Sequence, residues 1–215
     1  MDGPKYNRLG RLYFWAANRL YNEFSWTYDI VSWLVSFGRW AGWRRAVMGY
    51  LRGDRILEIG FGTGELLLEM SREGYNVFGL DRSSKMHRIT ERKLTRRGIH
   101  LPRVQGEAQA LPFAHHSFDT IVSTFPAEFI LEAKTLMEVA RLLSPLQASR
   151  FVIVGLPAVR NNLHQKSALE WICGINIQRV HDTFIQNAAD AGLNVQVEYH
   201  TTDRQRIPLV ILTPI

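Results

Sequence analysis

Three alternating glycines limit what this chain can fold into. Gly60, Gly62 and Gly64 stand between an apolar run at 55–59 and the segment 65–73, whose apolar residues recur at helical spacing. Glycine lets the backbone turn sharply and lets a ligand approach the main chain closely. A strand, a glycine turn and a helix in this order predict the first unit of an α/β sheet.

The alternation of short apolar runs and amphipathic segments continues to the C-terminus. Further strands are expected at 76–81, 101–105, 118–125 and 150–155, and helices at 84–97, 130–143 and 177–191. Two last runs, 195–200 and 207–213, have no helix between them and therefore predict a hairpin. The sequence thus predicts an open α/β sheet, mostly parallel, with helices on both faces and an antiparallel C-terminal hairpin strand.

Two common phosphate-binding loops do not fit the glycine segment. A dinucleotide fingerprint needs glycine where this chain has Glu65, and a carboxylate is a poor neighbour for a pyrophosphate. A P-loop needs a Gly-Lys-Ser/Thr sequence, which does not follow these glycines. The pattern therefore favours a ligand that carries no phosphate at this turn.

The segment Leu57–Gly64, which reads LEIGFGTG, resembles the first motif of class I S-adenosylmethionine-dependent methyltransferases. The resemblance covers residues 28–215 and implies a Rossmann-like sheet with S-adenosyl-L-methionine as cofactor. Upstream, Tyr28-Asp29 and the segment 38–44 resemble the N-terminal helices of ubiquinone/menaquinone-biosynthesis and lipid methyltransferases. This second likeness implies transfer of a methyl group to a small or lipophilic acceptor, quinol- or lipid-like.

The resemblance also implies a cofactor site. Asp81 ends the second predicted strand, where a carboxylate can accept hydrogen bonds from both ribose hydroxyls. Glu107 matches the acid that binds adenine in the family, where aspartate is commoner, and Ala108 would supply the next backbone amide. The other expected cofactor contacts are Tyr28, Glu58, Gly60, Phe61, Gly62, Gly64, Arg82, Met86, Thr124 and Phe125.

Catalytic residues are left unassigned by the sequence. Methyl transfer from a sulfonium needs a positioned acceptor and a dry pocket more than an acid–base pair. His164 and Glu128 are candidate groups near the expected rim of the site, whereas His115 and His116 are expected in a solvated turn. Phe125-Pro126 replaces the asparagine or histidine pattern that the family often has here. No spacing of histidine, cysteine and acidic residues predicts a metal.

The N-terminal quarter of the chain differs from the rest. Residues 1–55 hold nine Lys/Arg, four Asp/Glu and five of the six tryptophans, so they carry +5 of the total charge of +6. Two helices, at about 6–23 and 25–48, are expected to form a lid at 1–50 over a methyltransferase domain at 51–215. A membrane surface at 1–48 or a nucleic-acid surface are the alternatives. The lack of a visible RNA-binding module argues against the nucleic-acid surface, and a lid through which a small or lipophilic substrate is reached is the preferred interpretation.

Composition indicates the cellular compartment in which the chain works. No run approaches the ~18 apolar residues of a membrane-spanning helix, and no secretory signal is visible. A single cysteine, Cys173, excludes an intramolecular disulfide framework. These features predict a cytoplasmic enzyme, at most peripheral to a membrane. A module that binds the nucleoside cofactor without transfer, or an RNA methyltransferase, are the alternative functions.

Overall fold

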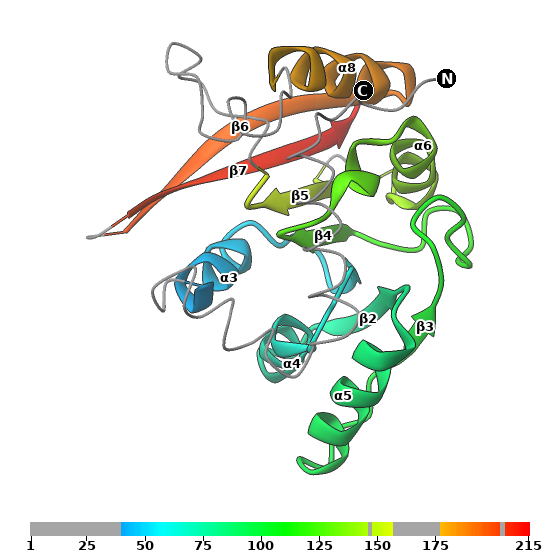
Figure 1. Ribbon diagram of the computed structural model, residues 1–215, viewed down its shortest axis with the longest axis vertical. Coiled ribbons are helices and arrows are strands. Elements are labelled where there is room, and N and C mark those ends of the chain that lie inside the picture. The colour runs from blue at the N-terminus through cyan, green and yellow to red at the C-terminus, as the bar shows by residue number, and fades with distance from the viewer. Residues whose placement is uncertain (1–39, 146–147, 157–176, 203–204) are drawn as a thin grey trace, which may run out of the picture.

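A computed structural model describes residues 40–145, 148–156, 177–202 and 205–215 of the 215-residue chain (Figure 1). The strands are β1 (Arg55–Ile59), β2 (Asn76–Asp81), β3 (Arg103–Gln105), β4 (Thr120–Thr124), β5 (Arg150–Val154), β6 (Leu193–Thr202) and β7 (Gln205–Pro214). The helices are α3 (Trp40–Met48), α4 (Glu65–Arg72), α5 (Ser84–Thr95), the 3-10 helix η1 (Glu128–Leu131), α6 (Ala133–Leu142) and α8 (Ile177–Asp190).

The seven strands form one sheet in the order β3-β2-β1-β4-β5-β7-β6. The first five strands are parallel, β7 is antiparallel to β5, and β6 pairs with β7 as a hairpin. The predicted α/β sheet with its antiparallel hairpin strand is therefore confirmed. The chain leaves β3 at one edge and returns to β4 beside β1, which creates a switch point. Ligands of open α/β sheets bind at the carboxyl ends of the strands at such a point.

Helices cover both faces of the sheet because β1 alternates its buried side chains between them. Leu57 and Ile59 pack in a cluster with residues of α6 and α8, whereas Ile56 packs with residues of α3 and α4. Each of these three side chains is at most 1% exposed. Figure 1 shows the same arrangement, with α6 and α8 on one side of the strands and α3 and α4 on the other.

Several predicted elements differ in their bounds. The helix expected at 130–143 is divided into η1 and α6, because Glu132 takes an extended backbone with ψ of 139° and caps α6. The strand expected from 118 begins at Thr120, because the backbone of Phe118 bonds to Leu142 and Ser144 instead of to β1. β6 and β7 are longer than expected, since their pairing continues from Leu193–Pro214 to Thr202–Gln205.

Several predictions fall outside the described residues. Residues 1–55 are called the lead-in below. The predictions outside the described residues are its helix at 6–23, most of its helix at 25–48, and the side chains of Trp15, Trp26, Trp33, Tyr28, His164 and Cys173. The described end of the second lead-in helix is α3, which packs near β5. Among the described residues, no helix combines the length and the apolar character that crossing a bilayer requires.

Candidate cofactor and acceptor site

The glycine loop joins β1 to α4 at the carboxyl edge of the sheet. Its backbone is closed by a 2.9 Å hydrogen bond from the Gly64 amide to the Phe61 carbonyl. Gly62 and Gly64 have φ of 52° and 74°, in the left-handed region that other residues avoid. A Cβ at Gly64 would lie 2.5 Å from Thr90, whereas a Cβ at Gly62 would meet no heavy atom within 4 Å. The loop is therefore packed from below at Gly64 and open above Gly62.

Asp81 ties this loop to the end of β2. One carboxylate oxygen accepts a hydrogen bond from the Gly62 amide and the other from the Ser83 amide, both at 2.8 Å. The side chain is 3% exposed, and this burial raises the pKa of Asp81, while the two amide hydrogen bonds oppose the rise. Ser83 caps α5, because its hydroxyl accepts a hydrogen bond from the Met86 amide. Asp81 is thus not the helix cap, and each of its oxygens keeps a further lone pair for a ligand hydroxyl.

The inward face of α5 supports the same loop, which the sequence did not reveal. The Thr90 hydroxyl donates to the Gly62 carbonyl at 3.0 Å, and the Lys93 ammonium donates to the Thr63 carbonyl at 2.7 Å. Lys93 also pairs with Glu65 at 2.5 Å. His87, Thr90 and Lys93 are spaced by three residues, as neighbours on one side of a helix are. This spacing is the one signal in the sequence that could have placed them on a common face.

The third loop, which follows β3, lies against Asp81. The Gly106 amide donates to the Asp81 carbonyl, and Asp81 is paired with Gln105 in the sheet. Glu107 is therefore only two residues from the strand position beside Asp81, and its side chain is exposed. Ala108 is 5% exposed and packs in the core below the loop. The structure thus brings the predicted ribose-binding and adenine-binding segments together at one edge.

Other predicted cofactor residues take different positions around the loop. Glu58 is 1% exposed in the middle of β1, and Arg82 is exposed at the end of β2. Phe61 and Met86 are 4% and 0% exposed and belong to the core on the α3 and α4 side. The Phe61 ring packs edge-to-face on His87 at 4.8 Å. The side chains of Phe61 and Met86 therefore stabilise the loop from below and offer a ligand almost no surface.

Two residues of α6 hold the loop after β3 in place. The Glu138 carboxylate accepts from the Leu111 amide at 2.7 Å, and the Arg141 guanidinium donates to the carbonyls of Leu111 and Phe113 at 2.9 and 2.8 Å. Glu138 and Arg141 also form a two-point ion pair at 2.8 and 2.7 Å. These bonds fix the backbone of residues 111–113, just beyond Glu107.

We expect Arg141→Met to lower the free energy of unfolding by roughly 1–3 kcal/mol, because it breaks two backbone hydrogen bonds and an ion pair. Cofactor affinity should fall severalfold as the loop loosens. Lys134→Met, an exposed change on the same helix, is the control and should alter neither quantity. Hydrogen bonding to Arg141 lowers the pKa of Glu138, so the Glu138–Arg141 clamp stabilises the fold fully at pH values above the ordinary glutamate pKa. This stabilisation is lost as the pH falls through the lowered pKa of Glu138. Thermal melts and calorimetric cofactor titrations of both variants provide the measurement. If Arg141→Met has the same melting temperature and cofactor affinity as Lys134→Met, the clamp is excluded.

An aromatic stack stands at the carboxyl ends of β4 and β5. Phe125 has φ of 51°, an uncommon conformation for a residue other than glycine. Its ring lies 5.2 Å from that of Trp43 of α3, at 18° between the ring planes. A Cβ at Gly155 would lie 2.3 Å from the Phe125 ring, so the glycine makes room for it. Such strain persists where neighbouring groups hold the residue in place, and it marks candidate functional positions.

Of the candidate acid–base groups, His115, His116 and Glu128 lie within the described residues. His115 and His116 are exposed, as expected, and precede β4 at the opposite edge of the sheet. The His116 ring contacts the Leu143 carbonyl at 2.8 Å. Glu128 begins η1, four residues beyond the carboxyl end of β4, and is exposed. In the described segments, no three metal-ligating side chains lie close enough together to hold an ion.

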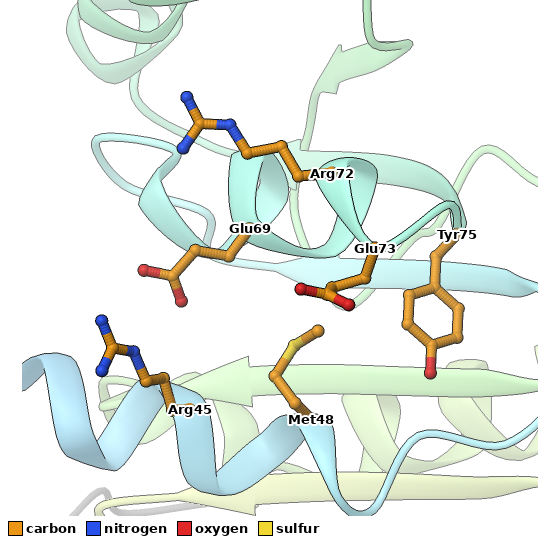
Figure 2. Close-up of a pocket in the computed structure, with 6 residues that line it drawn as sticks. All are labelled: Arg45, Met48, Glu69, Arg72, Glu73 and Tyr75. Atoms are coloured by element: carbon orange, nitrogen blue, oxygen red, sulfur yellow. The ribbon is translucent and has the colours of Figure 1, made fainter.

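A cleft of about 660 Å³ opens between α3 and α4 (Figure 2). In the figure the Arg45 and Glu69 side chains extend toward one another across it, while Arg72 points away. The lining residues are Arg45, Met48, Glu69, Arg72, Glu73 and Tyr75. None of them is a predicted cofactor residue, so this cleft is distinct from the site at the glycine loop.

Known proteins share this domain. A family profile described as a methyltransferase domain matches residues 56–146. The demethylmenaquinone methyltransferase of Thermus thermophilus is 32% identical over 144 residues, which are 64% of this chain and 64% of that protein. The ubiquinone/menaquinone biosynthesis C-methyltransferase of Yersinia pestis is 35% identical over 127 residues, or 55% and 51% of the two chains. This chain thus spans about half to two thirds of the length of these relatives.

Solved structures share the fold at lower identity. The geranyl diphosphate C-methyltransferase of Streptomyces coelicolor A3(2) superimposes with a TM-score of 0.62 at 15% identity, covering 81% of this chain and 79% of that one. A SAM-dependent methyltransferase of Aquifex aeolicus superimposes with a TM-score of 0.59 at 17% identity, covering 80% and 88%. The matched methyltransferase domain and the sequence relatives support a class I S-adenosylmethionine-dependent methyltransferase that resembles those of quinone biosynthesis, and the solved structures share its fold.

Proposed function

We propose that this chain transfers a methyl group from S-adenosylmethionine to a small, lipophilic, quinol-like acceptor. The observation that carries the proposal is the buried Asp81 carboxylate, which is bonded to Gly62 of the glycine loop at the carboxyl edge of the sheet. The two relatives that are named for quinone biosynthesis support an acceptor of this class.

The residues at this edge fit a nucleoside cofactor. A Cβ at Gly62 would meet no heavy atom, so there is open space beside the Asp81 carboxylate for the ribose. Asp81 would accept from the ribose hydroxyls, Glu107 would accept from the adenine amine, and the Ala108 amide would donate to the ring. When bound, the cofactor supplies an electrophilic methyl group on a sulfonium sulfur. The chain itself needs to hold that methyl group in line with the acceptor and away from water.

The acceptor would lie beyond the ends of β4 and β5, against the Trp43–Phe125 stack. Two stacked rings form a flat apolar wall, which suits a planar aromatic acceptor better than a charged one. In transfer, the acceptor would bond to the methyl carbon as the carbon–sulfur bond breaks. The sulfur would leave as a neutral thioether, and the proton lost by the acceptor would pass to solvent. Thr124, half-buried at the end of β4, lies beside this wall.

Residues 1–50 would complete the site as a lid in this proposal. The contact between Trp43 and Phe125 supports it, because it joins the described end of the lead-in to the end of β4. A lid would exclude water from the activated methyl group, which transfer requires.

Transfer of radiolabelled methyl groups tests the function. The purified chain is incubated with labelled S-adenosylmethionine and a water-soluble demethylated quinol with a short side chain, and the label extracted into organic solvent is counted. We expect label in the extracted quinol and none in an RNA sample treated in parallel. Tight cofactor binding with no transfer to the quinol would instead identify a nucleoside-binding module, and label in RNA would identify an RNA methyltransferase.

A further inference from the structure

The positive charge of the domain is concentrated in one segment. Residues 82–103 contain eight Lys/Arg and one Asp/Glu, a net charge of +7 within a chain whose total is +6. Residues 56–81 and 104–215 together hold nine Lys/Arg and fifteen Asp/Glu, a net charge of −6. The part of the chain that follows the lead-in is thus nearly neutral in total, but its positive charge is concentrated in residues 82–103 and its negative charge lies in the other segments. The basic segment comprises α5, its flanking turns and the start of β3.

The outward face of α5 presents a row of arginines. Arg88, Arg92 and Arg96 are spaced by four residues and are all exposed. They lie opposite the buried residues Met86 and Thr90, which face the protein. At 1.5 Å per residue the row extends for about 12 Å. In Figure 1, α5 lies at the periphery of the fold beside β2 and β3, and no other labelled helix covers this side.

Neighbouring carboxylates do not neutralise this row. The acid of the segment, Glu91, pairs with Arg103, and within the described residues no ion pair involves Arg88, Arg92 or Arg96. Like charges four residues apart destabilise a helix, whereas alternating signs would stabilise it. Helix stability therefore does not explain the row.

We propose that the α5 row of Arg88, Arg92 and Arg96 docks the protein on an anionic lipid bilayer. This proposal rests on the proposed function, because a lipophilic acceptor is dissolved in a bilayer. Clusters of Lys and Arg bind anionic lipid headgroups by electrostatic attraction. Residues 82–103 contain no Phe, Tyr or Trp, so they lack the aromatic platform on which single-stranded nucleic acids stack.

The position of the row suits such a dock. α5 begins three residues after Asp81, so the row starts beside the candidate cofactor site. Its inward face is bonded to the glycine loop through Thr90 and Lys93, which makes the helix a rigid support for the row. Within the described residues the three arginine side chains form no hydrogen bond or ion pair with the loop, and their replacement should leave cofactor binding unchanged.

Vesicle binding by the full chain tests the dock. Co-sedimentation uses neutral phosphatidylcholine vesicles and vesicles with about 30% phosphatidylglycerol, at about 50 mM and about 300 mM salt. We expect binding to the anionic vesicles alone, at least tenfold weaker at high salt. The triple variant Arg88→Gln, Arg92→Gln, Arg96→Gln should bind about 100-fold more weakly, since each headgroup contact contributes about fivefold. The triple variant with lysine at the same positions keeps the charge and should bind within threefold of the parent.

A matched control separates the row from net charge. Arg52→Gln, Arg72→Gln, Lys134→Gln removes three exposed positive charges elsewhere and should leave vesicle binding within threefold of the parent. Equal binding by the parent and the α5 glutamine variant, or equal weakening in the control, would overturn the dock. So would an RNA or DNA oligonucleotide that binds the row more tightly than the vesicles. Transfer to the soluble quinol, measured without vesicles, should be the same in the α5 variant and the parent, so a failure of the proposed function is distinguishable.

Discussion

Asp81→Ala should reduce the affinity for S-adenosylmethionine at least 100-fold. Each ribose hydroxyl would lose a bond to a charged acceptor, which contributes about 1.5–3 kcal/mol, and 1.4 kcal/mol corresponds to about tenfold in affinity. The Gly62 and Ser83 amides would lose their acceptor as well. The variant should therefore unfold at lower temperature than the parent, because Asp81 stabilises the loop in addition to binding the ligand.

Calorimetric titration with the cofactor and with NAD measures this effect. Asp182→Ala, an exposed carboxylate on α8, is the control and should bind the cofactor like the parent. An Asp81 variant whose affinity stays within twofold of the parent would remove the ribose assignment. Micromolar binding of NAD without binding of S-adenosylmethionine would remove the cofactor itself.

Affinity should also depend on pH through Asp81. Ribose hydroxyls donate to the ionised carboxylate, so affinity falls as pH falls through its pKa, and burial raises that pKa. When the pH is lowered from about 8 to about 4.5, cofactor affinity should begin to fall at a pH above the ordinary range of aspartate pKa values. The effect on protein stability has the opposite sign, because burial favours the protonated carboxyl of Asp81 in the folded state. The contribution of Asp81 to the free energy of unfolding is therefore greatest below the ordinary aspartate pKa, and it declines as the pH rises through the raised pKa.

Gly64→Ala should cause the largest loss of stability in the glycine loop, about 2–5 kcal/mol. The new Cβ would lie 2.5 Å and 2.9 Å from two atoms of Thr90, whose side chain is 0% exposed and cannot move away. To this overpacking, about 1–3 kcal/mol, is added the left-handed backbone, about 1–2 kcal/mol. The melting temperature should fall by about 5–15 °C, which a thermal melt followed by circular dichroism would show.

Gly62→Ala should separate folding from binding. Its Cβ meets no neighbour, so only the backbone strain of about 1–2 kcal/mol applies, but the methyl group enters the space beside Asp81. We expect a modest fall in melting temperature and at least a tenfold loss of cofactor affinity. Gly98→Ala has similar strain, with φ of 64° and no heavy atom near, and lies beyond α5 away from the site. If Gly98→Ala weakens binding as much as Gly62→Ala, the open space above the loop is not the ribose position.

The architecture was predictable because its signals are local. Apolar runs, amphipathic periods and terminal glycines each lie within one element, and the absence of a helix between 200 and 207 is enough to predict the hairpin. The same holds for Asp81 and the glycine loop, since a strand end and the following turn are adjacent in the chain. Bounds were less predictable where backbone pairing decided them, as at the start of β4, where Phe118 bonds to Leu142 and Ser144.

The supports of the site became visible only in the tertiary structure. Thr90 and Lys93 bond to carbonyls 28 and 30 residues away, and Arg141 bonds to carbonyls 28 and 30 residues before it. Backbone acceptors are the same in every residue, so no sequence pattern marks which carbonyl a side chain will reach.

The sequence by itself determined the fold class, the glycine loop and the acid that ends β2, because these depend on residues that are neighbours in the chain. Only the tertiary structure decided that Phe61 and Met86 pack beneath the loop, that Trp43 stacks on Phe125, and that the arginines of α5 share one outward face. Which side of an element is buried depends on the elements packed against it, and that packing joins segments far apart in the chain.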